Sequence, residues 1–383
     1  MSERHGRQSS EAGFHRSLLA QGKLINHYQP IVGLCSGEVF GVEVLGRLQD
    51  GSQTISPGAF LKNFGPAELD TLLFQSLHLG LETLRSCGHS HSELTMAFNV
   101  SPALLTSKGF SHRVISALHE GGINPRRITL EILEGDDFIN PTAASAEIGR
   151  LRAAGLSISL DDVGTAYSSL LRLRELPVDA IKLDQAFVRN LLEKPDDLQF
   201  VNSMITLARG LRKRLVVEGV ENDDIINALQ VLNVDAAQGY AIARPMPSEL
   251  LSAWLASHQV RPSERKPNCL LGAYAAHLVI VDTCHGLMRQ PLRLTWPATI
   301  HNPHACTIGV WFDQTGLHST LYGLAHKRFH EVITDYEQDP NGWNRIAEHF
   351  RDTLQAAISV EQDSRKAASQ GRAPTSILEC VQC

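Results

Sequence analysis

Short apolar segments alternate with amphipathic ones over most of this sequence. From Asn26 onward, eight runs rich in apolar and β-branched residues predict strands. These runs are HYQPIVGL, GVEVLGRL, MAFNVS, RITLEILE, LSISLDDV, DAIKLD, RLVVEGV and AAQGYAIARPM. Between most of them lie segments that predict helices, at 57–84, 103–120, 141–154, 197–211 and 225–232. The first two runs are joined by LCSGE, which is too short for a helix, so they should form an antiparallel hairpin. The pattern predicts an α/β fold, a closed (β/α)8 TIM-like barrel with one antiparallel strand.

Polar side chains recur where these predicted strands end. They are Glu43, Asn99, Glu131, Asp161, Asp162, Lys182, Glu218 and Gln238. In such a barrel the carboxyl ends of the strands meet at one face, where active sites lie. The oxygen ligands among them suit a hard divalent cation, and Asp162 is placed to bridge to a second one. Two cations about 3.5–4 Å apart can clamp a phosphodiester and activate a water molecule.

Each of these residues also has an ordinary structural explanation. Acidic residues at strand ends often cap the next helix, and a single lysine is usually a solvated charge. The adjacent pair Asp161 and Asp162 could be a solvated turn, although two neighbouring carboxylates repel each other unless a cation or proton lies between them. Eight such residues at consecutive strand ends favour a functional site.

Seven motifs occur in the order found in one known family. They are EVLGR (43–47), FNVS (98–101), EILE (131–134), DDVGTAYSS (161–169), KLD (182–184), EGVE (218–221) and QGYAIARPMP (238–247). On these motifs, residues 21–258 resemble the EAL-domain cyclic di-GMP phosphodiesterases. The resemblance implies hydrolysis of cyclic di-GMP to linear pGpG with two Mg²⁺ or Mn²⁺ ions.

The resemblance also implies a role for each matching residue. Glu43, Asn99, Glu131 and Asp161 would ligate one metal, Asp162 would join the two metals, and Glu218 and Gln238 would complete the metal and water network. Lys182 would bind the attacking water, and Glu134 would steady the loop after Asp162. The nucleotide would contact Gln29, Arg47, Asp184, Arg244 and Pro245.

The sequence departs from the family pattern in one loop. The usual DDFGTG is replaced here by DDVGTA, with Val163 and Ala166 in place of Phe and Gly. A glycine position can require φ > 0, which alanine resists. The departure leaves open a non-catalytic receptor for cyclic di-GMP that acts through a protein partner. A barrel enzyme with another phosphodiester substrate is the third possibility.

A second region begins after Trp254. Residues 259–268 predict a linker, and residues 269–360 predict a small all-α bundle with helices at 271–289, 306–311, 316–338 and 341–360. Residues 1–20 are expected to be a loosely held N-terminal extension. Residues 361–383 are expected to be a flexible tail, in which Cys380 and Cys383 give little indication of a function.

The bundle is rich in histidine. His326 and His330 are four residues apart and should project from one helix face, a spacing that suits one metal ion but is often accidental. His277 and Cys306 would complete a tetrahedral zinc site. With Gly309, Trp311 and Ala325, these residues resemble the CZB (chemoreceptor zinc-binding) family, which implies one Zn²⁺ and a zinc-bound thiolate that oxidants attack. Four further histidines of this region are expected at the surface, with His304 the main competitor as a ligand: His285, His301, His304 and His318.

Composition limits the cellular setting. A net charge of -6 argues against a surface that coats nucleic acid. The polar start lacks the apolar core of a signal peptide, and we expect no apolar run to approach the length of a membrane span. Seven scattered cysteines suggest a reducing compartment. We therefore expect a cytoplasmic protein without membrane or nucleic-acid partners, and a homodimer because both families commonly pair.

Overall fold

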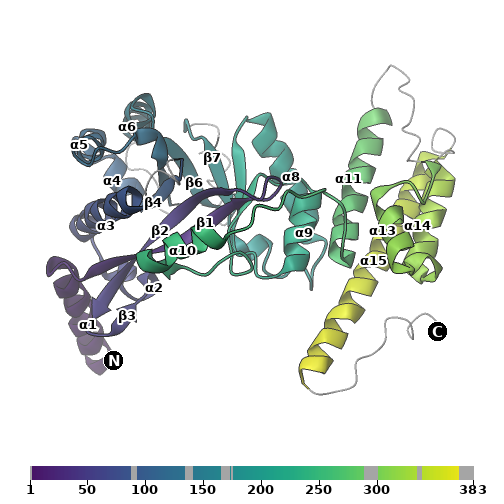
Figure 1. The fold of residues 1–383 in the computed structure, drawn as a ribbon, viewed down its shortest axis with the longest axis horizontal. Helices are drawn as coiled ribbons and strands as arrows, with labels where there is room; N and C mark the ends of the chain where they lie inside the picture. The colour runs from purple at the N-terminus through teal and green to yellow at the C-terminus, as the bar shows by residue number, and fades with distance from the viewer. Residues whose placement is uncertain are drawn as a thin grey trace.

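The computed structural model describes residues 2–87, 93–133, 141–164, 173, 176–288, 301–333 and 339–370. Its centre is a closed barrel of eight strands (Figure 1). In order around the ring, these are β1 (Leu24–Gly33), β9 (Ala236–Ala237), β8 (Arg214–Val217), β7 (Ala180–Leu183), β6 (Ser157–Val163), β5 (Ile128–Ile132), β4 (Met96–Val100) and β2 (Val39–Asp50). Pairing of β1 with β2 closes the ring, which confirms the predicted barrel.

Strand β1 is antiparallel to both of its neighbours in the ring, β2 and β9. The other neighbouring strands of the ring are parallel. The hairpin predicted from the short LCSGE connection is therefore present, with Gln29 opposite Glu43. Two short strands extend the sheet outside the ring, β3 (Gln53–Ile55) beside β2 and β10 (Met246–Pro247) beside β1. The predicted single strand at 236–246 is thus two short strands, β9 and β10, separated by a turn.

Helices follow most of the strands. They are α2 (Pro57–Phe60), η1 (Leu61–Asn63), α3 (Pro66–Ser86), α4 (Pro102–Leu105), α5 (Phe110–Glu120), η3 (Pro125–Arg127), α6 (Pro141–Ala153), η4 (Gln185–Phe187), α8 (Asp197–Gly210), α9 (Asp223–Val231) and α10 (Ser248–Ser257). The two helices predicted at 57–84 and 103–120 are each interrupted. In the first, Pro66 lies in the first turn of α3, so a new helix starts after Gly65. In the second, Gly109 has φ of +72° and precedes the first residue of α5.

The N-terminal segment is a helix, α1 (Ser2–Ala20), and its end is held by the barrel domain. Leu18 and Leu19 are buried in a cluster with Phe60 and Phe64. Arg16 donates to the carbonyl oxygen of Asn63 at 2.8 Å. The expectation of a loosely held start therefore differs from the structure at these residues, because the apolar pair near the end of α1 packs against the segment around α2.

The C-terminal region is helical, as predicted. It contains α11 (Leu270–Met288), α13 (Thr307–Thr315), η5 (Leu317–Ser319), α14 (Leu321–Val332) and α15 (Pro340–Ser369). Helix α15 continues past residue 360, so the first part of the predicted flexible tail is the last part of this helix. Cys380 and Cys383 lie outside the described residues.

Helix α11 joins the bundle to the barrel. It lies between α9 and α15 (Figure 1). Gly272 of α11 approaches Asn227 of α9 so closely that a Cβ atom would lie 1.9 Å from Asn227 Oδ1. Contrary to the sequence-based expectation, one stretch, 270–287, is long and apolar enough to cross a membrane by composition, and half of it is buried inside the protein. Its packing between two helices accounts for that apolar composition.

Candidate active site and candidate zinc site

Lys182 lies at the centre of a group of carboxylates at the carboxyl ends of the barrel strands. Its side chain is 1% exposed. The Nζ atom lies 2.5 Å from Glu218 Oε1, 2.9 Å from Glu131 Oε2, and 3.3 Å from both Glu43 Oε2 and Asp161 Oδ1. The carboxylates raise the pKa of Lys182 well above its ordinary value, although burial opposes them. The ammonium group is therefore a fixed positive charge.

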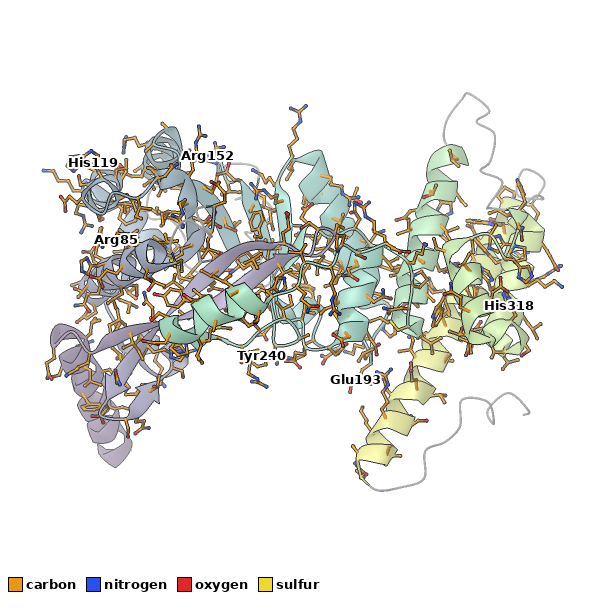
Figure 2. All side chains as sticks on the ribbon, viewed as in Figure 1. Arg85, His119, Arg152, Glu193, Tyr240 and His318 are labelled. Carbon is orange, nitrogen blue, oxygen red and sulfur yellow. The ribbon has the colours of Figure 1, made fainter. Side chains whose placement is uncertain are left out.

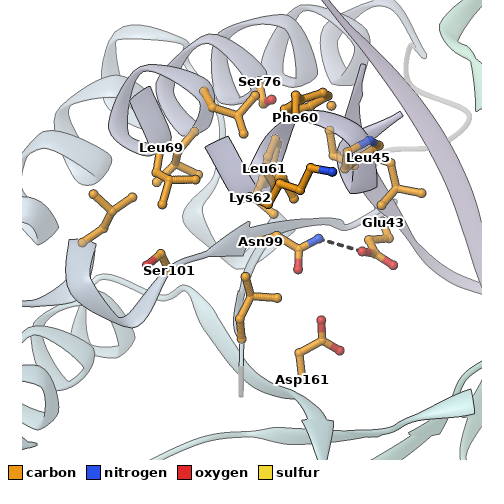
Figure 3. Close-up of a pocket in the computed structure, with 18 residues that line it drawn as sticks. Glu43, Leu45, Phe60, Leu61, Lys62, Leu69, Ser76, Asn99, Ser101 and Asp161 are labelled. Atoms are coloured by element: carbon orange, nitrogen blue, oxygen red, sulfur yellow. Dashed lines mark hydrogen bonds between the residues drawn. The ribbon is translucent and has the colours of Figure 1, made fainter. Parts of the chain in front are cut away.

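Two amide side chains hold Glu43. Asn99 Nδ2 donates to Glu43 Oε1 at 2.7 Å, and Gln238 Nε2 donates to Glu43 Oε2 at 2.7 Å (Figure 3 shows the first contact). Gln238 Nε2 also donates to Gln29 Oε1 at 2.9 Å, and Gln29 Nε2 donates to the carbonyl oxygen of Ala243. Lys182 and these amides keep the pKa of Glu43 below its ordinary value despite its burial. Glu43 is therefore held as a carboxylate.

Asp161 and Asp162 end strand β6 in an unusual backbone conformation. Asp162 has φ of +54°, a region that non-glycine residues seldom adopt. The pairing of β6 with β7 shifts register between Leu160 and Val163, so that the two aspartates can both face the site. One oxygen from each of Asp161, Asp162 and Glu218 lies within 4.8 Å of the others.

The carboxylates around this turn repel one another. Burial, followed by the charges of Asp161 and Asp184, raises the pKa of Asp162 to about 6. Burial raises the pKa of Glu218 to about 8, and it also raises the pKa of Glu131 and Asp161. Four carboxyl groups lie within 3.3 Å of the Lys182 ammonium group, and Asp162 lies beside Asp161 and Glu218, so this group holds more carboxyl groups than ammonium groups.

The donor set fits hard divalent cations. Carboxylate and amide oxygens are the ligands that Mg²⁺ and Mn²⁺ prefer. Within the part of the chain that the structure describes, the Oδ1 atom of Asn99 and the Oε1 atom of Gln238 are buried and have no hydrogen-bond partner. A buried polar oxygen without a partner is costly, and a cation beside it would remove that cost. The arrangement is therefore able to hold metal ions between the strand ends.

Two cavities open on either side of Glu43. One has a volume of about 530 Å³ and is mainly apolar, with Phe60, Leu61 and Leu69 in its wall and Glu43, Asn99 and Asp161 at one end (Figure 3). The other, of about 280 Å³, is polar. Its lining includes Gln29, Gln185, Arg189, Glu218, Gln238 and Tyr240. Glu43 can therefore be reached through an apolar cavity and through a polar one.

The residues predicted to contact the nucleotide differ in their burial and in their contacts. Gln29 is in the polar cavity, and Asp184 accepts from the backbone N–H of Ala186 and begins η4. Burial lowers the pKa of Arg47 below its ordinary value. The Arg244 guanidinium lies 4.1 Å from the centre of the Tyr240 ring, and Pro245 precedes β10.

Some functional candidates were missed or cannot be placed. Sequence reasoning did not single out Tyr240, although an exposed aromatic residue directly after the Gly239 turn is a signal for a binding surface. Val163 is buried and pairs with Leu183. Glu134 and Ala166 lie outside the described residues.

In the bundle, three of the four predicted zinc ligands come together. Cys306 Sγ and His330 Nε2 each lie 3.1 Å from His326 Nε2, and all three residues are buried. Cys306 begins α13, where its sulfur accepts from the backbone N–H of Gly309. Burial lowers the pKa of His326 to about 2 and raises the pKa of Cys306. The neutral imidazole is the form that binds metal.

His277 is not part of this three-residue group. Its Nε2 lies 2.9 Å from the carbonyl oxygen of Ala347 on α15, and its ring packs edge-on against Phe329 and Phe350. Its Nδ1 is buried and has no hydrogen-bond partner among the described residues. Burial lowers its pKa to about 4. The structure thus gives His277 the neutral state of a ligand but not contact with the other three.

The remaining histidines of the bundle are less buried. His301 and His304 are exposed, and His285 Nε2 lies 3.2 Å from Asn344 Oδ1. His304 and His318 both lie beside Asp313. His304 therefore does not join the buried group, which was the alternative left open by the sequence.

Comparison with known proteins supports the resemblance of the barrel to EAL-domain phosphodiesterases. A protein similar to this chain is the cyclic di-GMP phosphodiesterase RocR of Pseudomonas aeruginosa, with 36% identity over 233 residues, covering 60% of this chain and 59% of RocR. The bifunctional diguanylate cyclase/cyclic di-GMP phosphodiesterase MucR of the same species is 33% identical, covering 63% of this chain and 36% of MucR. The chain thus spans only about 36–59% of the length of these relatives.

Solved structures agree with the fold. The PaMucR phosphodiesterase in complex with c-di-GMP matches with a TM-score of 0.57 and 32% identity, covering 62% of this chain and 97% of that one. The FimX EAL domain from Pseudomonas aeruginosa matches with a TM-score of 0.52 at 19% identity, a likeness of fold.

The family model has boundaries that differ slightly from those we predicted. It begins at residue 13, inside α1, and ends at residue 245, before α10 and the helical bundle. Part of the predicted N-terminal extension is thus included in the match. Because the EAL domain model matches residues 13–245, more than half of the sequence, the chain belongs to the EAL domain family.

Proposed function

We propose that the barrel hydrolyses cyclic di-GMP to linear pGpG with two Mg²⁺ or Mn²⁺ ions. The observation that carries this proposal is the group of carboxylates around Lys182, with the unpaired oxygens of Asn99 and Gln238 beside it. Relatives named cyclic di-GMP phosphodiesterases support the choice of substrate.

In this proposal most of the polar residues hold the cations, and Lys182 holds the attacking water. Glu43, Asn99, Glu131 and Asp161 would hold one ion, and Asp162 with Glu218 would take part in holding the second, while Gln238 fixes Glu43. Bound divalent ions supply a nucleophilic water and offset charge on the phosphoryl oxygens. Lys182 would donate a hydrogen bond from Nζ to the attacking water and so orient it. Glu134 would steady the loop that follows Asp162.

Both cavities would take part in seating the dinucleotide. The apolar cavity beside Phe60 and Leu61 suits the face of a base. In the polar cavity, Tyr240 offers a ring and Gln29 an amide, while Arg244 keeps a positive charge beside the ring. Arg47 would meet a phosphate oxygen, and Asp184 and Pro245 would line the nucleotide path.

Turnover by the purified chain tests this proposal. With Mg²⁺ or Mn²⁺, pGpG should appear, and Glu43→Ala or Asp161→Ala should lower the rate by about 100-fold or more, since each removes a metal ligand. Glu120→Ala, on the exposed face of α5, is the matched control and should keep the wild-type rate. Full activity of the Glu43 and Asp161 variants would refute the mechanism.

The second candidate is a receptor that binds cyclic di-GMP without cleaving it. Val163 and Ala166, in place of the family's Phe and Gly, are the sequence features that favour it, and Val163 is the last residue of β6. Tight binding of cyclic di-GMP without pGpG would favour the receptor. Turnover of another phosphodiester in a nucleotide panel, without turnover of cyclic di-GMP, would point instead to a different substrate.

We further propose that the bundle binds one Zn²⁺ and adjusts the barrel in response to zinc or oxidants. Cys306, His326 and His330 would be ligands, with His277 as the fourth if its Nδ1 or Nε2 atom reaches the ion. One thiolate and neutral imidazoles are a typical zinc set. Purified protein should contain zinc, and Cys306→Ala should lose it and alter the response of the turnover rate to zinc. The proposal would be contradicted if the purified wild-type protein contained no zinc and added zinc did not change its turnover rate.

We also propose a cytoplasmic homodimer. The cysteines that the structure describes, Cys35, Cys87, Cys269, Cys284 and Cys306, are all free, as a reducing compartment favours. Light scattering on the full chain would give its mass in solution, and the mass of a single chain at every concentration would refute the dimer.

A further inference from the structure

A second group of potential metal ligands lies on the surface of the bundle. His304 Nδ1 is 3.0 Å from Asp313 Oδ1, and His318 Nε2 is 2.7 Å from the same oxygen. One ligand atom from each of the three residues lies within 4.8 Å of the others. The side chains are 58%, 45% and 26% exposed for His304, Asp313 and His318. Figure 2 shows His318 on the bundle, away from the barrel strands.

The three residues come from adjoining parts of one structural unit. His304 is in the turn before α13, Asp313 is on α13, and His318 is in η5 directly after it. The rings of His304 and His318 are 4.4 Å apart between centroids. Close packing at Gly309 fixes the turn against α13, because a Cβ atom there would lie 1.6 Å from the Pro303 carbonyl oxygen. The group is therefore fixed by backbone packing and does not depend on long flexible side chains.

Both histidines of the group contact the Asp313 carboxylate. His304 Nδ1 also lies 3.2 Å from Asp313 Oδ2. His318 Nε2 lies 2.7 Å from Asp313 Oδ1, so both imidazoles direct a ring nitrogen at the same carboxylate. A divalent cation held between the three side chains would take the place of the protons in these contacts. Two imidazoles and a carboxylate suit divalent transition metals.

This group is separate from the buried Cys306 group. Phe312 lies between them, with its ring 5.8 Å from the ring of His318 and 5.3 Å from that of His326. The surface group has no thiolate and faces solvent, whereas Cys306, His326 and His330 are buried. The two groups differ in ligand chemistry and in access.

We propose that His304, Asp313 and His318 form a solvent-open site for a divalent transition-metal ion such as Zn²⁺, distinct from the buried site. An ion there would join the turn before α13 to η5 after it. Both ends of α13 would then be fixed. The proposal depends neither on the activity of the barrel nor on metal at Cys306.

The test uses the full chain, freed of metal, and measures histidine carbethoxylation by mass spectrometry as Zn²⁺ is added. His304, whose side chain is 58% exposed, should react readily without metal, and His318, at 26%, should react more slowly. Both should become protected together at one Zn²⁺ concentration. His349, exposed on α15, is an internal control and should stay reactive. Because the reaction is followed residue by residue, metal bound in the barrel does not enter the result.

Two substitutions decide between a metal site and a simple ion pair. Asp313→Asn removes the shared ligand and should raise the Zn²⁺ concentration for protection by more than about tenfold. Asp363→Asn, on the exposed face of α15, is the matched control and should leave protection unchanged. Cys306→Ala should leave it unchanged too, if the sites are distinct. The proposal would be overturned if Zn²⁺ did not change the reactivity of His304 and His318. It would also be overturned if Asp313→Asn did not shift the Zn²⁺ concentration for protection, or if Cys306→Ala abolished the protection.

Discussion

At the scale of single residues, Lys182 governs the balance of charge in the barrel. Its ammonium group lies within 3.3 Å of four carboxylates and is almost completely buried. Removing one partner from a buried ionic group leaves the other charges uncompensated, which costs about 3–5 kcal/mol. We therefore expect Lys182→Met to lower the free energy of unfolding by about that amount in EDTA, as measured by urea denaturation.

A lysine on the surface provides the control for this prediction. Lys194 is exposed in the segment before α8, and Lys194→Met should change the free energy of unfolding by less than about 0.5 kcal/mol. If Lys182→Met were as stable as wild type in EDTA, the carboxyl groups would have to be protonated in the folded protein. The ammonium group would then not be what holds them together.

At the scale of elements, α13 depends on a glycine. Gly309 lies so close to the turn before the helix that a Cβ atom would be 1.6 Å from the Pro303 carbonyl oxygen. Gly309→Ala must therefore displace backbone, and we expect a loss of about 1–3 kcal/mol in urea denaturation. Gly286→Ala on α11 is the matched control, since a Cβ atom there meets nothing within 4 Å. It should be neutral or stabilise the protein by up to about 1 kcal/mol. Equal stability of the two variants would contradict this account of the turn.

The elements also show what the sequence could and could not predict. The strands were predictable because their apolar runs end on polar residues, and the interruption before α3 has its own signal in Gly65 and Pro66. Helix α1 was missed because its first half is polar, and only packing of Leu18 and Leu19 reveals why it is held.

The candidate site was predictable to a similar degree. Residues at strand ends were predictable because barrel topology brings strand ends together, and Glu43, Glu131 and Lys182 do meet. The bundle offers no such rule. Whether His277 faces a metal or the Ala347 carbonyl depends on how α11 is rotated against α15, which spacing in the sequence does not determine.

At the scale of the whole molecule, the barrel and bundle share an interface that begins at the linker. Asn227 on α9 is 4% exposed, and its side chain forms hydrogen bonds with the linker backbone before and after Pro267. Its Nδ2 donates to the Lys266 carbonyl oxygen at 2.9 Å, and its Oδ1 accepts from the Asn268 N–H at 2.9 Å. Farther along, Tyr274 on α11 donates to Asp196, and Lys366 on α15 pairs with Glu193. Figure 2 shows Glu193 close to α15. The linker is therefore fixed to α9 of the barrel by the Asn227 side chain.

Asn227→Ala should release the linker. The variant leaves an N–H and a carbonyl group without partners, which costs about 1–3 kcal/mol and raises the population of the locally opened linker. Trypsin reports this opening at one bond, after Arg265, because the bonds after Arg261 and Lys266 precede proline. We expect cleavage after Arg265 to be roughly ten- to a hundredfold faster in Asn227→Ala than in wild type. Asn202→Ala removes a bond from α8 to Asp282 on α11 but does not touch the linker, so its cleavage rate should match wild type. Equal rates in Asn227→Ala and wild type would mean that packing of α11 alone holds the linker, and the two hydrogen bonds would then not be what fixes the bundle to the barrel.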